Sequence, residues 1–239
     1  MNRIIVESKN DKAFVSALVS NLNIQNTEVD APISVDENSY VLLDGSDPNP
    51  AQPTLLIKKL KEIKTDIRKI GISNIGIILD IDNASHERRF LAVNNAIKEA
   101  FKKEYNSFTE VNEVCRFFPM QFGADLINFA CYFTNIEESG DLETLLRSIA
   151  VEETNFADCL ESWKTCIESK GHTISKKDFD KFWVSNYLRF DTCTREDSKQ
   201  AGKKCSFAAF DYVMTNKPQI FDLNSEHLDD LSEFLRLFI

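Results

Sequence analysis

Hydrophobic and polar residues follow two alternating patterns along the first half of the chain. Short runs rich in aliphatic residues predict β-strands, and longer stretches with apolar residues at every third or fourth position predict amphipathic helices. Because the two patterns alternate, they predict βαβ units and a mostly parallel sheet flanked by helices. The strands are expected at residues 3–6, 39–43, 74–79, 114–118 and 128–133, and the helices at residues 10–22, 53–69 and 86–103.

From about Gly140 onward the helical pattern dominates. We therefore expect an α/β domain over residues 1–150 and a helical C-terminal extension over residues 151–239 that packs on it. The helices of this part are expected at residues 141–151, 155–169, 176–187, 205–215 and 225–238. Aromatic stripes on them predict a core made of Trp163, Phe179, Phe182, Trp183 and Tyr187.

The composition is that of a globular protein, with 43% hydrophobic residues and a net charge of -10. An acidic chain does not attract a phosphate backbone through its overall charge, so binding of nucleic acid would need bound cations, a local basic patch or a partner that delivers the substrate. Residues 58–69 carry six basic and two acidic side chains. They form either such a patch or, as the charge pattern favours, a solvated helix face.

The sequence lacks the features that mark a membrane or secreted protein. No apolar run approaches the ~20 residues that span a bilayer, and the first residues form a strand pattern rather than a secretory signal. The six cysteines are scattered without a CxxC pair, which favours reduced thiols over a disulfide framework. We therefore expect a cytoplasmic protein without membrane contact.

Four carboxylates stand where predicted strands end. Glu7 follows the first strand, Asp80 and Asp82 follow the most apolar one, and Asp11 falls in the first turn of the helix after Glu7. Ligands of open parallel sheets bind beyond the carboxyl ends of the strands, so these side chains share one edge if the two strands are neighbours. Oxygen ligands of this kind suit Mg²⁺ or Mn²⁺. The alternative is that the aspartates only cap a turn or a helix.

The same residues resemble the signature of a known domain. The stretch "VESKND" at residues 6–11, followed by a helix and later by "GIILDID" at residues 76–82, resembles the Toprim domain, which has a glutamate after one strand and a DxD after a later one. The likeness is greatest to the OLD (overcoming lysogenization defect) branch of Toprim nucleases. It includes the glycine-bearing turn at residues 44–46 and "GDLETLL" at residues 140–146.

The resemblance implies a Toprim-like Rossmannoid fold and a set of site residues. The resemblance implies that Glu143 is a metal ligand, with Asp141 as a second candidate for that role. Both residues equally suit the first turn of a helix. A lysine would stabilise charge that develops on the phosphate, with Lys199 as a third candidate, although a solvated surface is the plainer interpretation for each lysine. The implied metal ligands are Glu7, Asp11, Asp80, Asp82 and Glu143, and the implied catalytic residues are Glu7, Asp80, Asp82, Lys203 and Lys204.

Two features limit how many residue roles the resemblance can supply for this chain. Ser8 stands where the family has a glycine, which reduces the freedom of the backbone beside Glu7. His86, Arg88 and Arg89 follow the DxD and are interpreted as surface residues of the next helix rather than as metal or phosphate contacts.

We expect a Mg²⁺- or Mn²⁺-dependent nuclease that hydrolyses phosphodiester bonds of DNA or RNA in the bacterial cytoplasm. No Walker A loop is present in the sequence. The OLD-like resemblance therefore implies an anti-phage defence or toxin-like effector that works with a separate ATPase, and a homodimer is a further expectation. One alternative is a catalytically silent Toprim-like module that binds a partner protein or nucleic acid. Another is a plain α/β domain in which Glu7 and Asp80 lie far apart.

Overall fold

The computed structural model describes residues 1–30, 54–81, 84–102, 104–134 and 141–239. The chain forms two compact units, one made of Met1–Asn135 with Asp230–Ile239 and the other of Ile136–Asp229. The division at residue 150 stays a prediction. The strand expected at residues 39–43 and the turn at residues 44–46 lie outside the described residues.

The first unit contains a six-stranded sheet with the strand order β2-β1-β3-β6-β5-β4. The strands β2, β1, β3 and β6 are parallel, whereas β5 is antiparallel to β6 and β4 is antiparallel to β5. The fold is therefore α/β with a mostly parallel sheet, as the alternating pattern predicts. The strands are β1 (Asn2–Ile5), β2 (Thr27–Val29), β3 (Asn74–Asp80), β4 (Tyr105–Phe108), β5 (Phe118–Phe122) and β6 (Asp125–Thr134).

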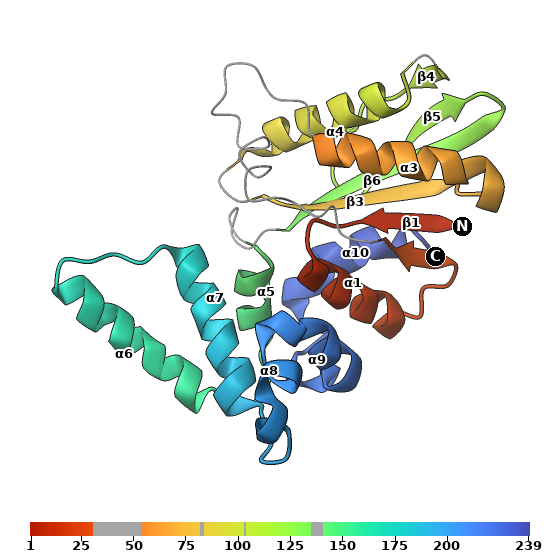
Figure 1. Ribbon diagram of the computed structural model, residues 1–239. Helices are drawn as coiled ribbons and strands as arrows, with labels where there is room; N and C mark the ends of the chain where they lie inside the picture. The colour runs from red at the N-terminus through yellow and green to blue at the C-terminus, as the bar shows by residue number, and fades with distance from the viewer. Residues whose placement is uncertain (31–53, 82–83, 103, 135–140) are drawn as a thin grey trace. The chain divides into compact units, whose positions relative to one another are not determined.

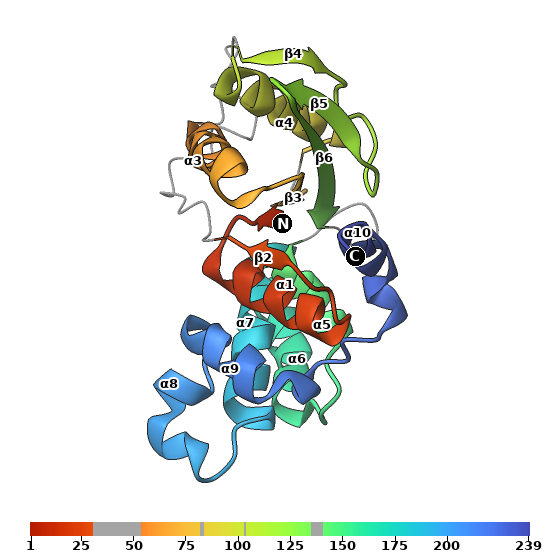
Figure 2. The same ribbon diagram turned by 90° about the vertical axis from the view of Figure 1, so that its right-hand side faces the viewer.

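Helices cover both faces of this sheet. Figures 1 and 2 show α3 and α4 on one face and α1 and α10 on the other. The apolar stripe of α3 is buried against the sheet as its spacing predicts, and the helix ends before Gly71, whose φ of 69° suits glycine. The helices of this unit are α1 (Lys9–Asn21), α3 (Thr54–Ile70), α4 (His86–Ala100) and α10 (Asp229–Arg236).

A row of three asparagines joins the amino ends of the central strands. Asn128 donates a hydrogen bond to Asn74 Oδ1 at 2.9 Å, and Asn74 donates to Asn2 Oδ1 at 2.8 Å. Asn2 in turn donates to the carbonyl of Phe238 at 2.8 Å. The last residues of the chain are thereby fixed to the sheet next to its first strand.

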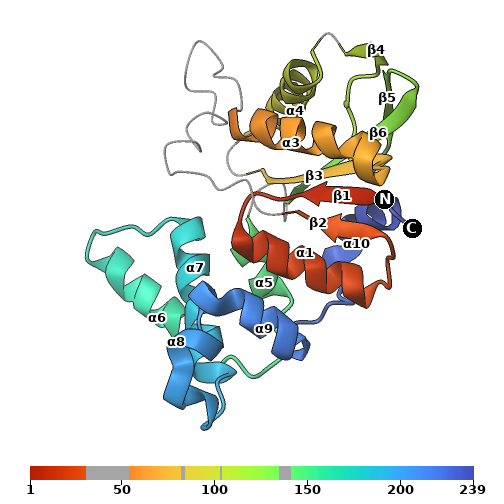
Figure 3. The same cartoon turned by 45° about the vertical axis from the view of Figure 1, so that its right-hand side comes forward.

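The second unit is helical around an aromatic core. Trp183 stacks on Tyr187 with ring centroids 5.3 Å apart, and the Tyr187 hydroxyl donates to the Ile220 carbonyl at 2.6 Å. Cys193 and Cys205 form a disulfide, so the expectation of reduced thiols is wrong for this pair. The α-helices are α5 (Leu142–Ser148), α6 (Asn155–Ser169), α7 (Lys176–Asn186), α8 (Ala201–Lys204) and α9 (Phe210–Asn216) (Figure 3). The shorter turns are the π-helical η1 (Tyr187–Asp191) and the 3-10 turns η2 (Asp197–Gln200), η3 (Phe207–Ala209), η4 (Pro218–Ile220) and η5 (Glu226–Leu228).

Several sequence predictions are corrected here. Residues 114–117 are irregular rather than a strand, because Cys115 adopts a φ of 55°, and β5 starts only at Phe118. The helix expected from residue 205 starts as α9 at Phe210. Trp163 and Phe182 are 39% and 41% exposed rather than core residues. None of the helices within the described residues is long and apolar enough to cross a membrane.

Candidate functional site at the carboxyl ends of the sheet

Glu7 and Asp80 lie at the ends of two adjacent parallel strands. Ile5 of β1 pairs with Ile77 of β3. Glu7 comes two residues after Ile5, and Asp80 comes three residues after Ile77. The two carboxylates are only 5% and 7% exposed. Neighbouring strands are separated by about 4.8 Å, and charged side chains are rarely this buried unless they are paired or bind a metal. The two strands are thus neighbours, as the acidic site requires.

Asp11 has a structural role in the first turn of α1. Its Oδ2 accepts a hydrogen bond from the Ser8 amide at 2.8 Å, and the Ser8 hydroxyl accepts one from the Asp11 amide at 3.2 Å. This reciprocal pair is a capping box, which satisfies two amides at the helix start. Ser8 therefore has a clear function as the N-cap of α1. The spacing S-x-x-D was a usable sequence signal for it.

Arg89 is a buried cation at the same edge of the sheet. It lies in the first turn of α4 and is 3% exposed, so its interpretation as a surface residue is wrong, whereas Arg88 is exposed as expected. The Arg89 Nη2 donates to the Ile81 carbonyl at 3.2 Å, and the Ile81 amide donates to the Thr134 carbonyl at 3.2 Å. The backbone that follows Asp80 is therefore held from both sides.

His86 remains a surface residue. Its ring lies 5.6 Å from that of Phe133 and 6.4 Å from that of Phe90. These apolar contacts account for its position on α4, and the described contacts give it no carboxylate partner. Sequence reasoning thus placed His86 and Arg88 correctly and missed only the buried Arg89.

Buried charges of both signs follow the strands at this edge. Glu7, Asp11 and Asp80 bring three carboxylates and Arg89 brings one guanidinium, all buried. Carboxylate oxygens are the ligands that Mg²⁺ and Mn²⁺ prefer, and a low dielectric strengthens their attraction to a cation. Within the described residues, no three His, Cys, Asp or Glu side chains form a group that could hold a metal. Asp82 lies outside them, so the predicted ligand set is described only in part.

The acidic residues near residue 143 belong to the second unit. Asp141 is the N-cap of α5, and its Oδ1 accepts hydrogen bonds from the Thr144 amide at 3.1 Å and the Thr144 hydroxyl at 3.2 Å. The capping interpretation thus accounts for Asp141. Glu143 lies in the first turn of α5 and is buried, and its role as a ligand stays a prediction.

The candidate lysines differ in their environments. Lys204 forms an ion pair with Asp197 at 3.1 Å, and Lys217 pairs with the same carboxylate. Hydrogen bonds from Lys217 and then Lys204 lower the pKa of Asp197 to about 2. Lys199 and Lys203 are exposed. Lys204 is therefore engaged in a local ion-pair network, which leaves Lys199 and Lys203 as the more available cations.

The basic run on α3 is largely neutralised by neighbouring acids. Lys59 pairs with Asp30 at 3.0 Å, and Lys64 pairs with Glu104 at 2.6 Å. Arg68 lies over the ring of Phe122 at 5.0 Å. This arrangement is that of a solvated helix face rather than of a basic patch for phosphates.

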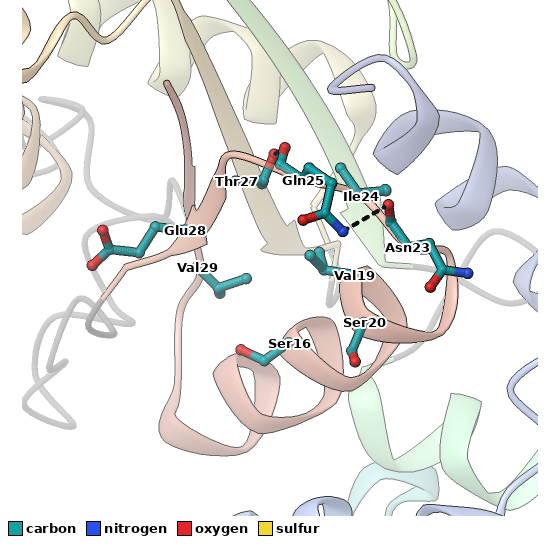
Figure 4. Close-up of a pocket in the computed structure, with 9 residues that line it drawn as sticks. All are labelled: Ser16, Val19, Ser20, Asn23, Ile24, Gln25, Thr27, Glu28 and Val29. Carbon is teal, nitrogen blue, oxygen red and sulfur yellow. Dashed lines mark hydrogen bonds between the residues drawn. The ribbon is translucent and has the colours of Figure 1, made fainter.

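A separate hollow of about 460 Å³ lies between α1 and β2 (Figure 4). Its walls are mostly uncharged and polar, and Gln25 closes one side with a hydrogen bond to the Asn23 carbonyl at 3.3 Å. Glu28 is the charged residue of this lining, and it already pairs with Arg3 at 2.8 Å. The hollow thus lacks the convergent charged groups found at the carboxyl ends of β1 and β3.

Comparison with known proteins gives one match. A family model described as "Protein of unknown function (DUF3226)" matches residues 1–239. No curated protein and no solved structure matches the chain. The match covers both compact units.

Proposed function

The chain belongs to the DUF3226 family, and we propose that it is a Mg²⁺- or Mn²⁺-dependent nuclease of Toprim type whose site is centred on Glu7 and Asp80. The observation that carries the proposal is the burial of these two carboxylates at the carboxyl ends of adjacent parallel strands. This edge of an open α/β sheet is where ligands bind. A buried pair of carboxylates there is suited to a hard cation.

Each residue of the site has a role in this proposal. Glu7 and Asp80 would hold the cation together with Asp82, and a bound Mg²⁺ would supply Lewis-acid activation of a water and stabilisation of the leaving oxygen. Arg89 keeps Asp80 in position through its hydrogen bond to Ile81. Lys203 belongs to the second unit, and its role in stabilising negative charge on the phosphate stays a prediction.

The cellular setting of the proposal rests on the resemblance to the OLD-like branch. It includes action in the bacterial cytoplasm as a defence or toxin-like effector, with a separate ATPase as partner and a homodimer as the active form. Co-purification from the native cell tests the partner, because an ATPase bound to this chain would be recovered with it at a fixed ratio.

A second candidate function is a catalytically silent module that binds a partner protein or nucleic acid. The specific observation in its favour is Arg89, a buried cation at the edge where the carboxylates lie. The capping box of Asp11 also favours the silent module, because it gives one predicted metal ligand a structural role. In this case the carboxylates and the guanidinium would stabilise the fold without a metal.

The experiment that separates the two is a cleavage assay with matched variants. Supercoiled plasmid, linear duplex, single-stranded DNA and total tRNA are incubated with the protein in Mg²⁺, Mn²⁺ or EDTA. The variants are Glu7→Gln and Asp80→Asn, and Asp66→Asn on α3 is the control because it removes a carboxylate far along the helix from the sheet edge. We expect metal-dependent cleavage that falls by about 100-fold or more in the two site variants and stays unchanged in the control.

Two results would contradict the proposal. Cleavage that survives in Glu7→Gln and Asp80→Asn would show that the activity does not come from this site. Absence of both cleavage and calorimetric binding of Mg²⁺ or Mn²⁺ would favour the silent module.

A further inference from the structure

The second unit exposes aromatic rings on one set of elements. Among the described Phe and Trp side chains, the largely exposed ones are all on α6, α7 and η1, whereas other aromatic residues of this unit form its core. Exposed aromatic side chains that are grouped in this way mark an interaction surface. The four are Phe156 (60% exposed), Trp163 (39%), Phe182 (41%) and Phe190 (52%).

These rings form two pairs. Trp163 of α6 contacts Phe182 of α7 with centroids 5.3 Å apart, and Phe156 contacts Phe190 of η1 at 5.8 Å. The eight residues from Phe182 to Phe190 correspond to about 12 Å along a helix. Figures 1 and 3 show α6 and α7 side by side, so the two pairs follow one helical hairpin.

The Phe156–Phe190 pair is anchored by a side chain that joins the two segments. Both oxygens of Asp191 accept hydrogen bonds at the start of α6, from the Phe156 amide at 2.9 Å and the Ala157 amide at 3.0 Å. This side chain fixes the start of α6 to the end of η1. The exposed rings therefore form a preorganised surface rather than loose side chains.

The segment from α7 to α8 is basic in an otherwise acidic chain, whereas α6 carries three acids and one lysine. The chain carries a net charge of -10, but residues 176–204 contain eight basic and five acidic side chains. Most of these cations are exposed, whereas Asp178 and Glu196 are the exposed acids, and the described contacts include no ion pair to any exposed cation of the segment. The exposed cations are Lys176, Lys181, Arg189, Arg195, Lys199 and Lys203.

A cation directly precedes an exposed ring at two places, one in α7 and one in η1. Lys181 directly precedes Phe182, and Arg189 directly precedes Phe190 with its guanidinium 5.7 Å from the ring centre. Residues 181 and 189 have the spacing of one helix face, Phe182 and Phe190 follow on the adjacent one, and the intervening Trp183 and Val184 are buried. Each aromatic pair therefore has a cation next to one of its rings in the sequence.

We propose that this face of α6, α7 and η1 binds single-stranded nucleic acid. Aromatic side chains stack on unpaired bases regardless of sequence, and neighbouring Lys and Arg side chains contact the phosphates. The bases of a duplex are already stacked on each other, so exposed rings select single strands. Stacking does not distinguish DNA from RNA, so the expected ligand is defined by the unpaired bases and phosphates that both share.

The inference deepens the proposed function, since it names the class of substrate that a nuclease of this chain would receive. Because the chain is acidic as a whole, contact with phosphates needs a local basic patch. The exposed cations of residues 176–204 provide one. Binding and cleavage are measured separately, so that either can fail without the other.

The test is fluorescence anisotropy with labelled oligo-dT, oligo-U and a duplex of equal length. The full chain carries Asp80→Asn and is kept in EDTA, so that no cleavage occurs. One double variant is Phe182→Ala with Phe190→Ala, and another is Lys181→Glu with Arg189→Glu. The matched controls are Leu126→Ala, an exposed apolar residue of the first unit, and Lys61→Glu on α3.

We expect single strands to bind at least tenfold more tightly than the duplex. The aromatic double variant should weaken the Kd by about tenfold or more. The charge variant should lower the slope of log Kd against log salt by about 1.4, which corresponds to two lost phosphate contacts. The controls should change neither quantity, and the relative Kd of oligo-dT and oligo-U distinguishes DNA from RNA.

Three results would overturn the inference. The first is no binding of single strands at low salt, whether or not the wild type cleaves nucleic acid. The second is binding that the aromatic and charge variants leave unchanged. The third is a dimer that the aromatic variant converts to a monomer without a change in oligonucleotide affinity, which would assign the surface to a second copy of the chain. Binding without any cleavage would contradict the proposed function and leave this inference intact.

Discussion

The carboxylates near the N-terminus have distinct roles that single substitutions can separate. Asp11 caps α1 with Ser8, whereas Asp80 ends a central strand. An amide retains the oxygen that accepts the Ser8 hydrogen bond but lacks the charge that binds a cation. Asparagine substitutions therefore distinguish a cap from a metal ligand at these positions.

We predict that Asp80→Asn abolishes stabilisation by Mg²⁺ and that Asp11→Asn preserves it. A site occupied at one hundred times its Kd stabilises a protein by about 2.7 kcal/mol. Thermal unfolding of the two variants and the wild type, with and without excess MgCl₂, measures this difference. Loss of the Mg²⁺ effect in Asp11→Asn would instead make Asp11 a ligand.

Arg89 offers a second test at the residue scale. We predict that Arg89→Met lowers the free energy of unfolding by about 2 kcal/mol, because it removes the buried guanidinium and its hydrogen bond to Ile81. The neighbouring Arg88→Met is the matched control, since Arg88 is exposed and its loss should cost less than about 0.5 kcal/mol. Urea unfolding of both variants gives the comparison. Equal stabilities would show that Arg89 does not support this edge.

The sequence was sufficient to locate the ends of the strands but not the surroundings of each side chain. Glu7 and Asp80 were identified because local hydrophobic runs end just before them. The burial of Arg89 depends on how α4 packs against the sheet, which no local pattern encodes. The exposure of Trp163 and Phe182 could not be predicted for the same reason. An apolar stripe shows which face of a helix is apolar, but it does not show what covers that face.

At the scale of elements, α10 is held by close contact with the centre of β3. Gly76 has no side chain, and a Cβ atom there would lie 2.8 Å from the ring of Phe238 and 3.1 Å from that of Phe234. The helix thus approaches the sheet as closely as it does only because this residue is glycine.

We predict that Gly76→Ala destabilises the first unit by about 1 to 3 kcal/mol through overpacking. Gly202→Ala in α8 is the control, because nothing lies within 4 Å of a Cβ atom at that position. Chemical unfolding followed by circular dichroism measures both. Phe238→Leu in the Gly76→Ala background should recover part of the loss, and a double-mutant cycle without coupling between the two positions would refute the packing argument.

Long periodic elements were predicted well, whereas the short strands β2 and β4 were missed. The helix at residues 155–169 and the strand at residues 74–80 have strong periodicity or a long apolar run, and both occur nearly as expected. The three residues of β2 and the four of β4 are too short to show alternation. Their strand conformation comes from hydrogen bonds to neighbours that are distant in sequence.

At the scale of the whole molecule, the cysteine spacing predicts reduced thiols, but the chain contains a disulfide bond. The bond between Cys193 and Cys205 closes a loop with a sequence separation of 12 in an otherwise thiol-bearing chain. Scattered spacing cannot reveal such a pair, because it is set by the packing of α8 against the segment after η1. Metal-ligand or redox motifs would have been visible, and neither was present in the sequence.

We predict that reduction of this disulfide lowers the free energy of unfolding by roughly 2 to 3 kcal/mol through the restored freedom of the unfolded loop. Unfolding in urea with and without dithiothreitol measures the effect. Cys193→Ser with Cys205→Ser should be as stable as the reduced wild type and insensitive to the reductant. Cys159→Ser, which removes an exposed free thiol, should retain the full response, and an unresponsive wild type would exclude the bond as a stabilising element.

The attachment of the last residues to the first strand has a consequence for biosynthesis. A ribosome makes β1 first and α10 last, with the entire second unit between them. At about 5–20 residues per second, the sheet waits roughly five to twenty seconds for the helix that covers Gly76 and Ile4. During this interval the nascent chain presents an apolar sheet face to chaperones, and a chain that lacks α10 and the residues after it would leave that face permanently open.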